Sequence, residues 1–133
     1  MKEIYFPMSA RVLTVGHIKA LEFLIKQGFV TVGLLTAEAM KGYKKEIVPF
    51  KDRLYILDTI AIALGNIDVI PQDSLDPSGN LSKGKYNALA SGDGFEPVEE
   101  KAIKKFKLEK INIKLYGEKE KLYSSSKILC KQK

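Results

Sequence analysis

The chain has few of the residues that most often carry chemistry. Its 133 residues include one histidine and one cysteine, and only Arg11 and Arg53 among its 22 basic residues are arginines. A lone cysteine, Cys130, cannot form an internal disulfide, which favours a reducing compartment, so we expect a cytoplasmic protein. No apolar run approaches the roughly 20 residues of a membrane span. The opening MKEIYFPM is too short and too mixed for a signal peptide.

Two further absences narrow the function. The chain has no G-x-G-x-x-G fingerprint and no G-x-x-x-x-G-K-[ST] loop, so it matches neither the dinucleotide oxidoreductases nor the P-loop enzymes. A formal charge of +6 suits a phosphate-rich small ligand, a nucleic acid or a solvated lysine surface. The hydrophobic share of 45% and charged share of 29% are ordinary for a globular domain, and we expect one domain over residues 1–133.

The hydrophobic pattern predicts strands that alternate with helices. Gly28 is placed to cap the first helix at its C-terminus. The next connection, residues 37–49, bears lysines and has only weak periodicity, and residues 73–85 form a long polar loop. Strands are expected at residues 3–8, 29–36, 67–71, 86–93 and 110–117, and helices at 16–27, 50–64, 96–107 and 124–131.

This alternation is typical of βαβ units with right-handed crossovers. The expected fold is therefore α/β: a Rossmann-like parallel sheet of about five strands with helices on both faces. Such sheets bind ligands outside the carboxyl ends of their strands. Three segments follow strands there: residues 14–17, residues 36–53, and the segment from Gly92 onward.

The only histidine, His17, follows Gly16 at the expected start of the first helix. A helix N-terminus offers unpaired N–H groups and positive potential, which suit phosphate, and an imidazole can add a hydrogen bond to a phosphoryl oxygen. The ordinary alternative is a histidine at the protein surface. Similar alternatives stay open for Ser124–Ser126, which could bind an anion or simply cap the last helix, and for the lysines at 41, 44 and 45, which could be a solvated loop.

The order of these segments resembles the H-x-G-H nucleotidyltransferases, particularly their cytidylyltransferase branch. The segments are T-V-G-H at the first helix, V-G-L-L-T at the end of the second strand, G-Y-K-K, F-x-x-R, I-D-V-I-P, a G-D strand end, and S-S-S-K-I. In particular, PMSARVLTVGH, VGLLTAEA and GYKK resemble stretches of the cytidylyltransferase domains associated with phosphoenolpyruvate mutase. The resemblance covers nearly the whole chain in order and spacing.

The resemblance implies roles for individual residues. His17 would stabilise charge in the transition state, and Lys44 would reach the phosphates from its loop. Arg11 would lie where the acceptor binds, in place of the family's aspartate. Gly65 and Gly94 also depart from the family pattern, as does Thr14, which replaces the first histidine. The implied nucleotide-binding residues are Met8, Ser9, Thr14, Gly16, His17, Arg53, Asp93, Ser124, Ser125 and Ser126.

The reaction implied by the resemblance is transfer of CMP from CTP to a phosphate- or phosphonate-bearing small molecule, with release of pyrophosphate. Mg²⁺ would be bound through the nucleotide phosphates, with no dedicated protein ligands, and relatives are commonly homodimers. Two alternatives remain. T-x-G-H also occurs in ATP-dependent adenylyltransferases of this fold, and a diverged member could be inactive or bind nucleic acid through its lysines. Clustered aromatic residues for base stacking are lacking, which disfavours the nucleic-acid alternative.

Overall fold

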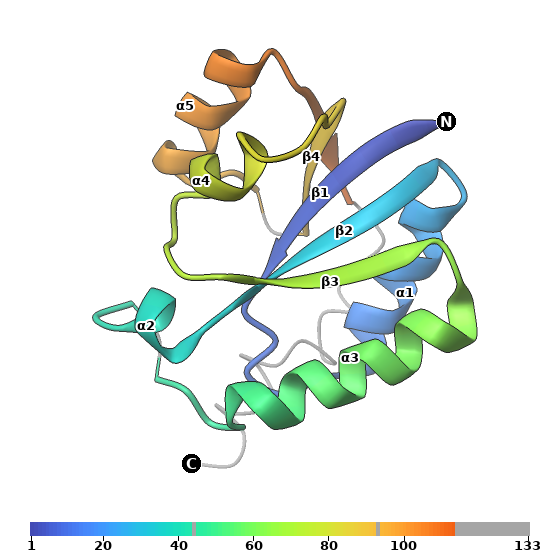
Figure 1. Ribbon diagram of the computed structural model, residues 1–133, viewed down its shortest axis with the longest axis vertical. Helices are drawn as coiled ribbons and strands as arrows, with labels where there is room; N and C mark the ends of the chain where they lie inside the picture. Colours follow the sequence, from blue (N-terminus) through green and yellow to red (C-terminus); the bar gives the residue numbers. More distant parts are fainter. Residues whose placement is uncertain (44, 93, 114–133) are drawn as a thin grey trace.

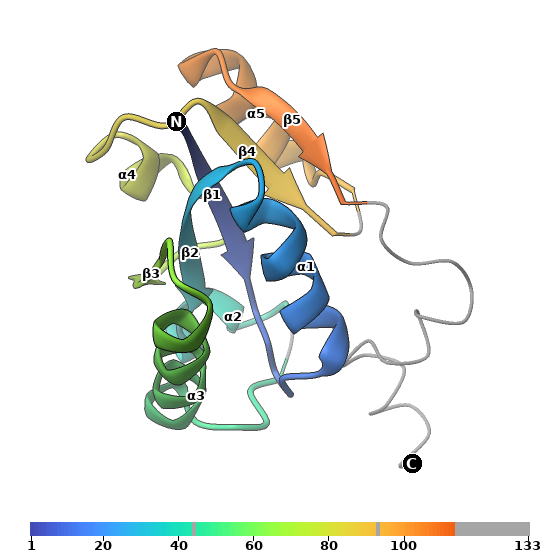
Figure 2. The same cartoon turned by 90° about the vertical axis from the view of Figure 1, so that its right-hand side faces the viewer.

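The protein, seen in a computed structural model, contains one parallel sheet with helices on both faces (Figures 1 and 2). The structure describes residues 1–43, 45–92 and 94–113; the helix expected at residues 124–131 lies outside them. The strands are β1 (Lys2–Met8), β2 (Gly28–Leu35), β3 (Ile67–Gln72), β4 (Ala88–Ser91) and β5 (Glu109–Asn112). The helices are α1 (Val15–Ile25), α2 (Ala37–Met40), α3 (Phe50–Leu64), α4 (Ser78–Leu81) and α5 (Pro97–Phe106).

The strand order is β3-β2-β1-β4-β5, and every neighbouring pair is parallel. Strand order therefore reverses at the central strand β1, which is the arrangement of a Rossmann-like sheet. The predicted fold class is confirmed. The loops that follow β1 and β2 lie together with α2 at one end of the sheet (Figure 1), and this is the carboxyl edge where ligands bind in such folds.

Successive side chains of strand β1 point to opposite faces of the sheet, and helices cover both faces. Ile4, Phe6 and Met8 belong to a core with α1 and α3, whereas Tyr5 packs with residues of α4 and α5, including Ile103. A strand covered on both sides reads as a nearly continuous apolar run. This explains why the sequence segments of β1 and β2 show so little polar alternation.

Two glycines have structural roles that the sequence did not predict. Gly28 does not cap α1; Lys26 does, and Gly28 begins β2, where a Cβ would lie 2.1 Å from the carbonyl oxygen of Lys2 on β1. Gly65 ends α3 with a φ of 78°, and its N–H donates to Ala61 O. Because L side chains disfavour that φ, the end of the helix gives a physical reason for glycine at this position.

The other differences are at element ends. Strand β4 is shorter at both ends than the predicted strand over 86–93, and the loop over 73–85 contains the single turn α4. The lysine-bearing connection begins with the four-residue helix α2, capped by the Thr36 side chain, which accepts from Ala39 N–H. Within the described residues, no helix has both the length and the apolarity to cross a membrane.

Candidate functional site

The N-terminus of α1 is organised by His17 and Thr14. Nδ1 of His17 accepts a hydrogen bond of 3.0 Å from the backbone N–H of Thr14, and the Thr14 hydroxyl lies 3.2 Å from the same nitrogen. A backbone N–H can only donate, so Nδ1 carries no proton in this arrangement. The neutral ring must then carry its proton on Nε2. The two ring nitrogens therefore differ: Nδ1 accepts the capping hydrogen bond from Thr14 N–H, and Nε2 carries the proton of the ring.

The loop between β1 and α1 has an unusual backbone. Met8, the last residue of β1, is buried, and Ala10 has a φ of 45° although its side chain is only 1% exposed. The other described non-glycine residues with positive φ, Asn66 and Lys107, both follow helices, where such a conformation is common. Ala10 follows a strand and has no such explanation. Non-glycine residues held at positive φ occur preferentially at functional sites.

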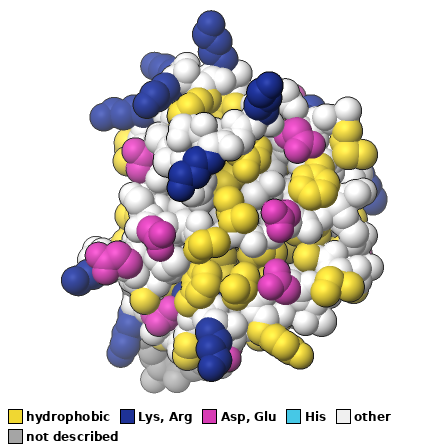
Figure 3. Space-filling view, in the orientation of Figure 1, with side chains coloured by type: hydrophobic (Ala, Val, Ile, Leu, Met, Phe, Trp, Pro, Cys, Tyr) yellow, Lys and Arg dark blue, Asp and Glu magenta, His cyan; other side chains and the backbone are white. Residues whose placement is uncertain are grey.

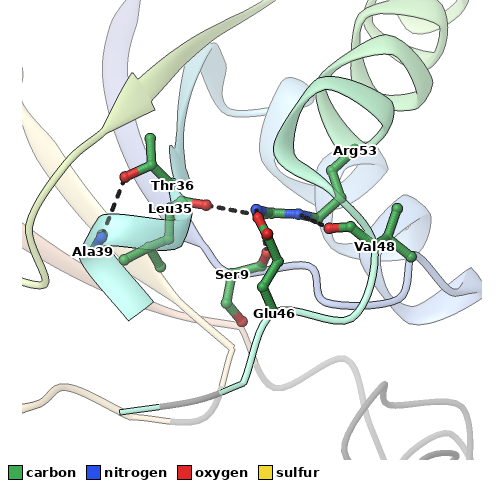
Figure 4. Close-up of polar contacts among 7 residues, drawn as sticks. All are labelled: Ser9, Leu35, Thr36, Ala39, Glu46, Val48 and Arg53. Carbon is green, nitrogen blue, oxygen red and sulfur yellow. Dashed lines mark hydrogen bonds and ion pairs between the residues drawn. The ribbon is translucent and has the colours of Figure 1, made fainter. Parts of the chain in front are cut away.

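Arg53 is the most buried polar side chain near this loop, with 0% exposure. Its guanidinium donates to the carbonyl oxygens of Ser9 (2.9 Å), Leu35 (2.7 Å) and Val48 (2.8 Å). Its Nη2 pairs with Oε2 of Glu46 at 2.6 Å (Figure 4). The resemblance implied direct nucleotide binding by Arg53. Burial and these four protein acceptors point instead to a role in holding the surrounding loops.

Arg11 is half-buried in the same loop as Ala10. In the described part of the chain, its Nε is the only buried side-chain nitrogen or oxygen atom without a hydrogen-bond partner. A buried donor without an acceptor costs free energy, so this N–H is a candidate contact for an anionic ligand. The two arginines of the chain therefore have opposite surroundings: Arg53 is surrounded by acceptors, whereas Arg11 Nε has none.

The turn after β4 has one described feature that bears on the predicted site. The Ser91 hydroxyl donates to the carbonyl oxygen of Gly94, and Gly94 has a φ of 106°. Because residues with a side chain rarely adopt such a φ, this backbone conformation gives a physical reason for glycine at position 94. Five of the predicted site residues lie outside the described residues, and their roles stay predictions: Lys44, Asp93, Ser124, Ser125 and Ser126.

A polar hollow at the carboxyl end of β3 was not predicted. Its volume is 320 Å³, and it is lined by Gln72, Asp73, Ser74, Asp76, Gly79, Asn80 and Lys83. Beneath it, the Tyr5 hydroxyl donates to Oε1 of Gln72 at 2.6 Å and accepts from Nδ2 of Asn80 at 2.9 Å. Burial raises the pKa of Tyr5 well above its usual range, so the hydroxyl stays protonated. No local motif reveals this network, because Tyr5 is 67 residues from Gln72 and 75 residues from Asn80 in the sequence.

The basic charge is spread unevenly over the surface. Lysine and arginine side chains gather in the upper part of Figure 3, where Figure 1 places α4 and α5, while acidic and apolar side chains occupy much of the middle. Part of this charge is paired: Lys110 lies 2.5 Å from Glu100, and Lys2 lies 2.7 Å from Glu109. The exposed lysines are thus interleaved with carboxylates, which is a poor match to a continuous phosphate backbone.

The fold and this arrangement define a Rossmann-like α/β protein with a histidine-capped helix after its central strand. Solved structures of similar fold include a lipopolysaccharide core biosynthesis protein from Thermoplasma volcanium GSS1. It is 18% identical to this chain with a TM-score of 0.71, and the match covers 88% of this chain and 99% of that protein. A likeness at this identity establishes the fold alone. No protein-family model and no curated protein sequence matches the chain.

Proposed function

We propose that the protein is a nucleotidyltransferase that transfers CMP from CTP to an anionic small molecule and releases pyrophosphate. The observation that carries the proposal is the geometry of His17 at a helix N-terminus: its Nδ1 accepts from Thr14 N–H, so the proton of the ring is on Nε2. A neutral donor and a helix N-terminus together suit the charge of a phosphoryl group. The similar structure, described as a biosynthesis protein, supports an enzyme of this fold.

In the proposed reaction, an oxygen of the acceptor's phosphate or phosphonate attacks the α-phosphorus of CTP. The new P–O bond forms as the bond from the α-phosphorus to the bridging oxygen breaks, and pyrophosphate leaves with the electron pair. The attacking oxygen is already anionic, so the chain's lack of a second histidine is no obstacle. The protein's contribution is in-line positioning and stabilisation of the negative charge on the transferring group, with His17 donating to a phosphoryl oxygen.

In the proposed reaction, Mg²⁺ is bound by the phosphates of the nucleotide. Among the described residues, no group of three or more His, Cys, Asp or Glu side chains is placed to hold a metal ion. The proposal therefore assigns the metal to the phosphates of the nucleotide. When bound there, Mg²⁺ would neutralise part of the phosphate charge.

The acceptor is proposed to carry an anionic group that binds Arg11. The buried Nε of Arg11 has no partner within the described chain, and an acceptor anion would supply one. A guanidinium also repels an amine-bearing acceptor such as phosphocholine. The expected acceptors are anionic phosphonates or phosphorylated polyols.

Pyrophosphate release tests the proposal directly. The protein would be incubated with Mg²⁺ and either CTP or ATP, against a panel of phosphonates, phosphorylated polyols and phosphocholine. Release with CTP and an anionic acceptor is the expected result. Preference for ATP would identify an adenylyltransferase instead. No release with any pair, together with no change in melting temperature in either nucleotide, would reject the proposal.

The same thermal measurement addresses the nucleic-acid alternative. A single-stranded oligonucleotide should leave the melting temperature unchanged, because α5 and β5 carry acidic residues as well as lysines, and Lys2 and Lys110 are paired with carboxylates. A rise with the oligonucleotide and none with CTP would favour a binding module.

A further inference from the structure

Arg53 joins three segments that are far apart in the sequence. Its bonds reach Ser9 after β1, Leu35 at the end of β2, and Glu46 and Val48 in the loop before α3. Figure 4 shows the guanidinium at the centre of these groups. Arg53 belongs to the first turn of α3, and its Cζ lies 5.6 Å from the centre of the Phe50 ring. One side chain thus holds the two loops that follow the neighbouring strands β1 and β2.

The cost of burying this charge indicates that the arrangement does more than fill space. Removing a guanidinium from water is expensive, and an apolar side chain of similar volume could pack the same place without that cost. Only a rigid fork of donors can hold several carbonyl oxygens at fixed separations. Both loops lie at the carboxyl edge of the sheet. One leads to His17, and the other carries the exposed lysines Lys41 and Lys45.

We propose that Arg53 is a positioning residue, and that its pair with Glu46 fixes the lysine-bearing loop relative to the loop that leads to His17. The proposal rests on the nucleotidyltransferase function for its catalytic consequence. Glu46 is the charged link in this arrangement, and the other three acceptors are backbone carbonyls. Loss of the Glu46 carboxylate should free residues 45–48 while β1, β2 and α3 stay folded.

Removal of the Glu46 carboxylate should lower turnover more than it lowers the stability of the fold. A loop displaced by about an ångström can lower turnover by up to roughly 100-fold, because donors no longer meet the charge that develops on the transferring group. We expect Glu46→Ala to lower kcat by between 10- and 100-fold, on the scale of such displacements. The KM of the acceptor should change little, because Arg11 is not part of the Arg53 arrangement. Glu46→Gln keeps an oxygen acceptor and should recover part of the lost turnover.

The test combines hydrogen exchange with steady-state kinetics on Glu46→Ala, Glu46→Gln and the matched control Glu100→Ala. Glu100 also forms a short ion pair, with Lys110, but on α5 and β5, away from this loop. Faster amide exchange at residues 45–48 in Glu46→Ala, with unchanged exchange in β1 and normal behaviour of the control, is expected. Arg53→Lys, which keeps the charge and loses the fork, should resemble Glu46→Ala if it folds.

The outcomes separate this proposal from the function on which it rests. Unchanged exchange at residues 45–48 in Glu46→Ala would overturn the positioning role whether or not the wild type is active. Faster exchange with unaltered kcat would overturn its link to catalysis. An inactive wild type would reject the nucleotidyltransferase function, while the exchange data would still decide whether Glu46 holds the loop.

Discussion

At the scale of single residues, His17 combines a structural task and a proposed chemical task. Nδ1 accepts from Thr14 N–H, as the side chain of Glu or Gln does at the third position of a capping box. The sequence motif suggests phosphate binding, but it does not reveal which ring nitrogen is engaged by the backbone. Because the two tasks use different atoms, substitutions can separate them.

His17→Gln should keep the helix cap and lose the imidazole donor, whereas His17→Ala should lose both. We expect kcat to fall by roughly 10² or more in each variant, the scale of losing one donor to a developing charge. Unfolding by urea should show Gln close to wild type and Ala less stable by about 0.5–2 kcal/mol, the cost of a lost cap. Near-full turnover in either variant would contradict the proposed role of Nε2.

Arg11 should control acceptor binding and leave CTP binding unaffected. A hydrogen bond to a charged group contributes about 1.5–3 kcal/mol, so Arg11→Ala should raise the acceptor KM by about tenfold or more. Steady-state kinetics with each substrate varied in turn would measure this. Arg11→Lys, which keeps the charge without the fork, should have an intermediate effect. Equal changes in both KM values, or phosphocholine as the best acceptor, would show that Arg11 does not bind the acceptor anion.

The sequence identified both arginines as noteworthy but did not distinguish their environments. The resemblance implied a nucleotide contact for Arg53, which is fully buried among protein acceptors. The acceptors are backbone carbonyls from separate segments, together with one carboxylate seven residues away. Every residue has a backbone carbonyl, so the sequence does not show which carbonyls accept from the guanidinium. Only the folded chain shows that they converge.

At the scale of elements, the helices α3 and α5 were predicted more accurately than strand β4. Helix α3 spans Phe50–Leu64, the predicted range, because its apolar stripe, with Leu57 and Ala61 buried, is long and regular. Helix α5 spans Pro97–Phe106, with acidic residues early and lysines late, as its macrodipole favours. Strand β4 has only four residues, and its ends depend on pairing with β1 and β5. Local patterns carry no information on where such pairing stops.

The end of α5 provides a stability test. Lys107 caps this helix in the left-handed conformation, with a φ of 56° and a ψ of 51°. That conformation costs an L residue about 1–2 kcal/mol, and glycine adopts it readily. Lys107→Gly should therefore stabilise the protein by about 1 kcal/mol, measured by urea unfolding. Lys105→Gly, inside the same helix, should destabilise it by about 1 kcal/mol. A loss of stability in both would contradict the capping role.

At the scale of the whole molecule, side chains connect strands that are not neighbours. The Tyr5 hydroxyl on β1 reaches Gln72 on β3 across the intervening strand β2. The crossing is possible because β2 has Gly33 there; a Cβ at Gly33 would lie 1.9 Å from the Tyr5 hydroxyl. The V-G-L-L segment was noted for its family resemblance, and the structure gives its glycine a physical reason.

Removal of the Tyr5 hydroxyl should be costly. Tyr5→Phe leaves Oε1 of Gln72, a residue only 2% exposed, without this donor, and the expected loss is about 1–3 kcal/mol in urea unfolding. Tyr86→Phe is the matched control: its ring packs edge-on against Tyr5, and the change should stay within about 0.5 kcal/mol. Equal losses in the two variants would show that the cross-sheet hydrogen bond adds no stability.

The parallel α/β architecture could be predicted because strands and helices alternate along the chain. The order of strands in space is a different matter. The position of β1 between β2 and β4 follows from pairings such as Lys2 with Gly28 and Ile4 with Ala88. The local composition of these segments does not show which strands pair with one another. The sequence predicted a Rossmann-like parallel sheet without the order of its strands, which the structure supplies.

The central position of β1 has a consequence for synthesis. Of the described strands, β1 is synthesised before the others, yet its pairing with β4 requires a partner 84 residues later, since Ile4 pairs with Ala88. At about 5–20 residues per second, one edge of β1 waits several seconds for that partner. Until then the nascent chain can form only β3, β2 and β1, with an apolar edge strand open to other chains. The central strand of the finished sheet is thus an edge strand during part of its synthesis.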